Sequence, residues 1–63
     1  MKVSVSGLNP FSDLLKDGFE KLGHKISSED LDLIYANDPR GYEMSLDLKK
    51  LNPKATLIFN LLK

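Results

Sequence analysis

The order of elements between residues 32 and 59 constrains the fold more than any other feature of the chain. Residues 33–35 (Leu-Ile-Tyr) form a short apolar run, which is typical of a strand covered on both faces of a parallel sheet. Residues 37–39 (Asn-Asp-Pro) then offer a helix N-cap followed by proline at the first helical position. Asn52-Pro53 ends the helix, and a second apolar run starts at Ala55. This order predicts a β-α-β crossover unit.

The N-terminal half predicts another strand and another helix. Residues 2–7 alternate weakly around two valines, and Ser12 is a suitable N-cap for the helix that follows. Apolar residues and one glycine then fall at helical spacing: Leu14, Leu15, Gly18, Phe19 and Leu22. We expect Gly18 to let this helix approach the sheet closely and Gly23 to end it. In the second helix, residues 42–51, we expect Met44, Leu48 and Leu51 to be buried.

The fold class that follows is α/β: a small three- to four-stranded parallel, Rossmann-like sheet with two helices on opposite faces. The strand at residues 3–6 is expected to lie between the strands at 31–36 and 56–61, joined by right-handed crossovers. Residues 24–27 are too close to the next strand for a parallel crossover between the two. We predict an edge fragment or a loop there.

Composition excludes several classes of protein. Nine basic and nine acidic residues give no net charge, which argues against a nucleic-acid partner. Apolar runs fall far short of the roughly 20 residues that a membrane span needs, and no signal peptide is visible, so we expect a cytoplasmic chain. With no cysteine and one histidine, we predict no metal site and no cofactor. The 63 residues make one small domain or a piece of a larger one.

Candidate ligand-binding residues follow the strands, because open parallel sheets bind ligands at the carboxyl edge. Gly7 and Asn9 lie in the first loop, which leads into a helix N-terminus that favours phosphate. That loop lacks the G-x-G-x-x-G spacing, so an ordinary tight turn is the alternative. Asn37 and Arg40 form a second polar corner, in which Asp38 is expected to cap the helix. No pattern of side chains predicts a catalytic residue.

Four segments carry a resemblance to a known family. They are Gly23-His24-Lys25-Ile26 after the first helix, residues 32–39 (DLIYANDP), residues 48–51 (LKKL) and residues 57–60 (LIFN). In this order they resemble the N-terminal domain of GT-B glycosyltransferases, in particular the retaining family once called group 1. The resemblance covers most of the chain and implies descent from an enzyme that takes its sugar from a nucleotide-sugar donor. It also implies that residues 1–63 are a single partial Rossmann-like domain, the first half of the family's N-terminal domain.

The chain departs from that family at its catalytic positions. Tyr35 stands where the family has a histidine, and the family's later His-Asp pair falls at Leu62-Lys63. Members of the family bind the nucleotide-sugar donor with a second, C-terminal Rossmann-like domain, which is not part of residues 1–63. The resemblance therefore implies a glycosyltransferase fragment that is inactive by itself and binds a nucleotide sugar only in a full-length context, and whether this chain is itself an enzyme stays open.

Two alternatives remain beside the glycosyltransferase interpretation. The chain could be a stand-alone α/β module for protein interaction or dimerisation, or a piece of another Rossmann-like protein. The run from Ala55 to Leu62 is nearly free of charge and is expected to form an edge strand. We therefore predict a homo-oligomer formed through this strand, with two copies pairing antiparallel about a twofold axis.

Overall fold

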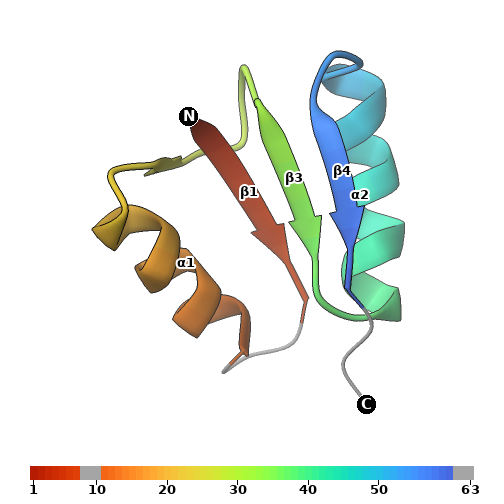
Figure 1. The fold of residues 1–63 in the computed structure, drawn as a ribbon. Coiled ribbons are helices and arrows are strands. Elements are labelled where there is room, and N and C mark those ends of the chain that lie inside the picture. The colour runs from red at the N-terminus through yellow and green to blue at the C-terminus, as the bar shows by residue number, and fades with distance from the viewer. Residues whose placement is uncertain (8–10, 61–63) are drawn as a thin grey trace.

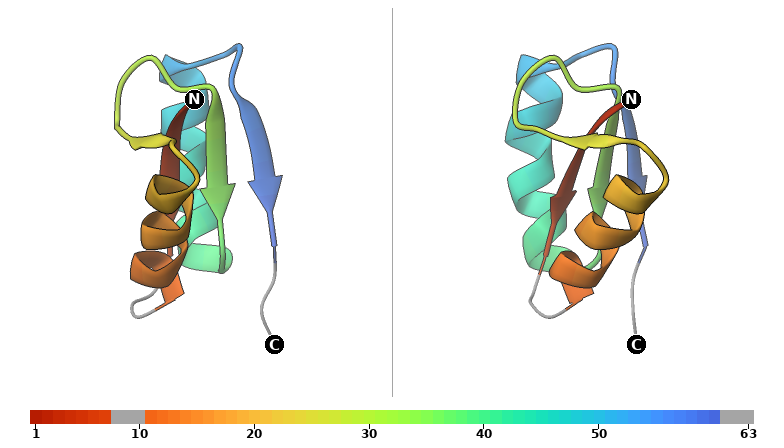
Figure 2. Two further views of the ribbon diagram at one scale, coloured as in Figure 1. Left: turned by 60° about the vertical axis from the view of Figure 1, so that its left-hand side comes forward. Right: turned by 90° about the vertical axis from the view of Figure 1, so that its left-hand side faces the viewer.

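The computed structural model describes residues 1–7 and 11–60. Four parallel strands form one sheet in the order β2-β1-β3-β4, and two helices cover its opposite faces (Figures 1 and 2). The elements in chain order are β1 (Lys2–Ser6), α1 (Phe11–Lys21), β2 (Lys25–Ile26), β3 (Leu33–Ala36), α2 (Pro39–Leu51) and β4 (Thr56–Phe59). The predicted α/β class and the placement of the helices are confirmed. Among the described residues, no helix is long and apolar enough to cross a membrane.

The predicted strand order is wrong in one respect. We expected β1 to separate β3 from β4, whereas β3 lies between β1 and β4 and pairs with both. After a strand, the chain can cross to the neighbouring position on either side of that strand. Right-handedness fixes the face on which the crossover helix lies for each of these two directions, but it does not decide between them. The chain leaves β3 through α2 and returns to the adjacent position, away from β1.

The short segment after α1 forms an edge fragment, one of the two alternatives that the sequence left open. β2 has only two residues, Lys25 and Ile26, and they pair with Lys2 and Val3 of β1. It therefore lies on the far side of β1 from β3, so the few residues between β2 and β3 do not have to make a crossover between neighbouring strands.

Helix α1 ends as predicted, but its start differs. The backbone N–H of His24 donates to the carbonyl oxygen of Phe19 at 3.0 Å, and Gly23 takes a φ of +92°, which together form a Schellman C-cap. Ser12, expected as the N-cap, is instead the second helical residue and is buried.

Helix α2 begins as predicted, and of the three residues expected to be buried only Leu48 packs against the core. The Asp38 carboxylate accepts the backbone N–H of Gly41 at 2.7 Å, and Pro39 is the first helical residue. The buried residues are Gly41 and Ser45, whereas Met44 and Leu51 are 62% and 79% exposed. The apolar spacing was misleading because the sheet offers this helix a surface of small residues, Ser4, Ser6 and Ala36, which are themselves buried.

Close approach of helix to sheet occurs at Gly41, and the expectation for Gly18 is wrong. A Cβ atom added at Gly41 would lie 2.3 Å from the carbonyl oxygen of Ser6 in β1. A Cβ atom added at Gly18 would meet nothing within 4 Å. Thus α2 packs backbone to backbone against the sheet, while α1 keeps its glycine on an open side.

The hydrophobic core lies mainly between the sheet and α2. Leu31, Ile34 and Ala55 form its buried cluster, and Leu48 and Leu57 pack against it. On the other face, α1 covers β1 and β2 and leaves part of β3 and β4 open, as the two side views show (Figure 2). Tyr35 touches Phe19 of α1 edge to face and is only half buried, and its register partner Ile58 is 43% exposed.

Candidate functional site

The strand order creates a topological switch point between β1 and β3. The chain leaves β1 through α1 toward one side of the sheet and leaves β3 through α2 toward the other (Figure 1). The two connections therefore diverge at the carboxyl ends of these strands, where doubly wound proteins bind their ligands. Gly7 directly follows β1, and Asn37 directly follows β3.

Gly7 and Asn37 are brought into direct contact at this switch point. The backbone N–H of Asn37 donates to the carbonyl oxygen of Ser6 at 3.0 Å, which continues the ladder between the strands. Its side chain turns toward Gly7, where an added Cβ atom would lie 1.2 Å from Oδ1 of Asn37. Gly7 has a φ of +145°. Only glycine combines this backbone conformation with such close approach.

The side-chain oxygen of Asn37 has an unusual environment. Asn37 is 1% exposed, and its Oδ1 atom has no hydrogen-bond partner among the described residues. Buried polar atoms are nearly always paired, because desolvating one without compensation costs about 1–3 kcal/mol. A free acceptor in a dense corner of the switch point is therefore a feature of the site, and it calls for an O–H or N–H donor.

The other candidate residues are placed less closely. Arg40 is exposed in the first turn of α2 and makes no ion pair with a described residue. Asn9 lies outside the described residues. Asp38 is committed to capping α2 through Gly41. The structure thus joins Gly7 with Asn37 and leaves Arg40 as an exposed cation on the adjacent helix.

A second polar contact at this edge was not predicted. The side-chain amide of Asn60, which follows β4, donates to the phenol oxygen of Tyr35 at 2.9 Å. The two residues are 25 positions apart, so no local pattern connects them. The only signal was the resemblance, which placed Tyr35 and Asn60 in segments aligned with family motifs.

The described part of this edge contains no histidine. The single histidine, His24, lies at the opposite end of β1, where its Nδ1 is 3.2 Å from the N-terminal nitrogen of Met1. At about 3.3 Å per strand residue, roughly 20 Å of strand separates Met1 from Gly7. Within residues 1–7 and 11–60, no three histidine or carboxylate side chains gather as a metal site would require. The edge can therefore hold a polar ligand through amide, phenol and backbone groups.

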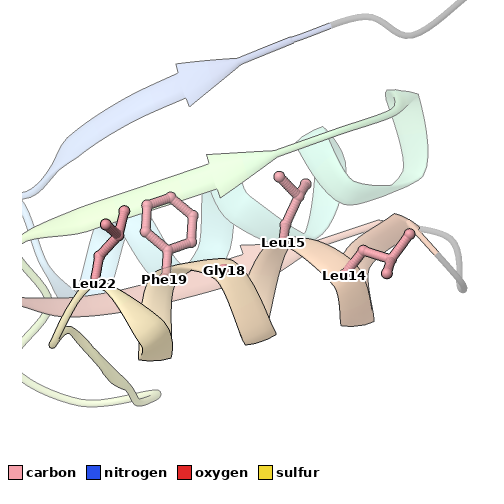
Figure 3. Close-up of a pocket in the computed structure, with 5 residues that line it drawn as sticks. All are labelled: Leu14, Leu15, Gly18, Phe19 and Leu22. Atoms are coloured by element: carbon pink, nitrogen blue, oxygen red, sulfur yellow. The ribbon is translucent and has the colours of Figure 1, made fainter.

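A separate apolar groove lies on α1. It has a volume of about 240 Å³ and is lined by four residues of this helix and the residue that follows it: Leu14, Leu15, Gly18, Phe19 and Leu22. Figure 3 shows Leu15, Phe19 and Leu22 rising from the same side of the helix. The lining residues have no polar side chain, so the groove is suited to apolar contact.

Comparison with known proteins adds no relative from which a site could be transferred. No family model, no curated protein and no solved structure matches the chain.

Proposed function

We propose that this chain forms part of a glycosyltransferase that uses a nucleotide-sugar donor, and that it does not transfer sugar by itself. The contact between Gly7 and Asn37 is the observation that carries the proposal. This contact joins Gly7, in the loop after β1, to Asn37 after β3. Asn37 stands at a position where the glycosyltransferase family has histidine or asparagine. The resemblance implies that both segments face the substrate cleft.

The chemistry of the edge supports a sugar-bearing ligand. The free Oδ1 of Asn37 requires a hydrogen-bond donor, and hydroxyl groups of a sugar are donors. The exposed guanidinium of Arg40 would suit a phosphate. With His24 at the far end of the sheet, no described carboxylate–histidine pair could assist transfer, so catalytic groups would have to come from outside the described residues.

We expect at most weak binding of a nucleotide sugar to the isolated chain, because a single face of a cleft supplies few contacts. Nuclear magnetic resonance titration with UDP-glucose at millimolar concentration should shift the amide signals of Gly7, Asn37 and Arg40. Calorimetry should show no saturation in the micromolar range, and no glucose should be released or transferred.

Two results would count against this proposal. Micromolar affinity for the isolated chain would show that the donor does not need a second domain. Shifts confined to α1 or β2, or no shifts at all, would remove the carboxyl edge as the ligand site. Reading the coding sequence beyond Lys63 gives an independent check, since the proposal expects it to continue into a second Rossmann-like domain.

A second candidate function is self-association through β4. In the part of the chain that the structure describes, no segment pairs with the outer edge of this strand. Ile58 and Phe59 are 43% and 44% exposed, and they lie on opposite faces of the strand. An edge strand with apolar residues on both faces and no lysine or proline invites pairing with another copy. The predicted interface ran from Ala55 to Leu62. Ala55 is buried in the core, and residues 61–62 lie outside the described residues, so the proposed interface is now limited to β4.

Ile58→Lys is expected to weaken this association about tenfold or more, because it places a charge on the exposed side of the edge strand. The chain should stay folded, since Ile58 belongs to no buried cluster. Sedimentation gives the association constant and circular dichroism the fold. Phe59 is a poorer probe, because its ring stacks on Tyr42 at 4.8 Å. Unchanged association of folded Ile58→Lys would eliminate the β4 edge.

A further inference from the structure

One flank of α1 is apolar, exposed and built around a glycine. Leu14, Gly18 and Leu22 follow one another at intervals of four residues and therefore lie in one row along the helix. Leu14 is 67% exposed and Leu22 is 76% exposed. Together with the neighbouring groove of Figure 3, they leave an unpartnered apolar surface on the side of α1 that does not face β1.

Gly18 has no role within the described part of the chain. Its φ is not positive, and a Cβ atom there would meet nothing within 4 Å. Glycine inside a helix lowers stability relative to alanine, so neither backbone conformation nor packing within the chain accounts for its presence. Glycine between two exposed leucines would allow a second helix to cross at that point, because the missing side chain lets the two helix backbones approach each other closely.

We propose that this flank is a contact between two copies of the chain, with the two α1 helices antiparallel and crossing at Gly18. A twofold axis through the crossing places the residue four positions before Gly18 opposite the residue four positions after it. Leu14 of one copy then meets Leu22 of the other, twice. The row is self-complementary, as an isologous interface requires. This proposal deepens the second candidate function, self-association, and assigns it a surface separate from β4.

The charges beside the row agree with the antiparallel arrangement. Asp13, Asp17 and Lys21 form a parallel row displaced by one residue, and Lys21 pairs with Asp17 of its own helix at 3.1 Å. The same twofold axis places Lys21 of one copy level, along the helix axis, with a point between Asp13 and Asp17 of the other copy. Each of these two residues is then about 3 Å from Lys21 along the axis, because the rise is 1.5 Å per residue. Lys21 of each copy can therefore pair with a carboxylate across the contact as well as with its own Asp17, and the chain as a whole carries no net charge.

The area available sets the strength of the contact. A standard interface buries about 800 Å² per partner, which would be just under a fifth of the 4422 Å² that this chain exposes. The flank contributes three large side chains that are more than half exposed, Phe11, Leu14 and Leu22. A single helix pair is smaller than the standard interface, so the expected dimer is weak and dissociates on dilution.

Gly18→Ala separates association from folding. Alanine should raise the midpoint of unfolding, because it improves helix propensity in open space. The same methyl group should weaken the dimer about tenfold by forcing the helices apart at the crossing. A variant that is more stable and yet associates less is not explained by misfolding. Analytical ultracentrifugation up to about 1 mM and thermal unfolding of the dilute monomer provide the two measurements.

Leu22→Glu and Leu51→Glu form a matched pair. The two leucines are 76% and 79% exposed, and Leu51 lies at the end of α2. We expect Leu22→Glu to reduce association at least tenfold, because it sets a carboxylate against Leu14 of the other copy. Leu51→Glu should leave association unchanged.

Each other outcome overturns the proposal in a recognisable way. A wild-type chain that stays monomeric at the highest concentration removes self-association altogether, through β4 as well as α1. A dimer that survives Leu22→Glu and is lost with Ile58→Lys assigns the contact to β4 alone. Equal losses with Leu22→Glu and Leu51→Glu indicate unspecific apolar association without a defined interface.

Discussion

Gly41→Ala is expected to destabilise the protein by about 2 kcal/mol, although alanine normally improves a helix. The added Cβ atom would lie 2.3 Å from the carbonyl oxygen of Ser6 and 2.9 Å from the backbone nitrogen of Gly7. These atoms belong to β1 and its continuation, and they are held in place because Ser6 pairs with Ala36 of β3 and its carbonyl oxygen accepts the backbone N–H of Asn37 at 3.0 Å. Helix α2 must shift away instead, which opens the core around Ile34.

Gly18→Ala is the matched control for this prediction. It makes the same chemical change inside the other helix, where nothing lies within 4 Å, and should stabilise the fold by up to about 1 kcal/mol. Urea unfolding followed by circular dichroism gives both values. A domain of 63 residues has a total stability of only about 3–9 kcal/mol, so a difference of this size is readily measured. Equal effects of the two substitutions would contradict the close approach of α2 to β1.

Gly7→Ala is expected to cost about 3 kcal/mol or more and to distort the switch point. Its φ of +145° is unfavourable for any residue with a side chain. In addition, the new Cβ atom would lie 1.2 Å from Oδ1 of Asn37, so the 1% exposed amide would have to leave its place. The strain from the backbone and the clash with the side chain therefore act together.

A double-mutant cycle with Asn37→Ala divides these two causes. Removing the Asn37 amide relieves the clash and leaves the backbone strain, so the double variant should recover only part of the loss. Full recovery would assign the whole effect to the clash with Asn37. No coupling at all would show that Gly7 and Asn37 do not touch, and it would withdraw the observation on which the proposed ligand site depends.

Features that depend on neighbouring residues were predictable from the sequence. Asp38 and Pro39 start α2, and Gly23 ends α1 through a Schellman motif, because capping joins groups only a few positions apart. The short distance along the chain to β3 excluded β2 as its parallel neighbour, and left an edge fragment or a loop as the alternatives. Together with the apolar runs, these signals were enough for a parallel α/β sheet. The placement of the helices on opposite faces was predicted together with a wrong strand order, and it depends on the direction in which each crossover steps.

The candidate site was predictable only in part. The carboxyl edge follows from the fold class, and Gly7 and Asn37 follow from their position after strands. Their contact with each other, and the hydrogen bond between Tyr35 and Asn60, join residues 25 or more positions apart. Such pairs depend on which strands are neighbours and on their register, and no pattern within one segment encodes that information.

The sequence by itself determined the types of element, the start of α2, the end of α1 and the α/β class, since these depend on periodicity and capping within a few residues. Tertiary structure alone decided the position of β3 between β1 and β4, because handedness permits a crossover to step in either direction. It also decided which glycine is packed. Gly18 and Gly41 look alike within their helices, and only the Ser6 backbone lying against one of them makes Gly41 the point of closest approach.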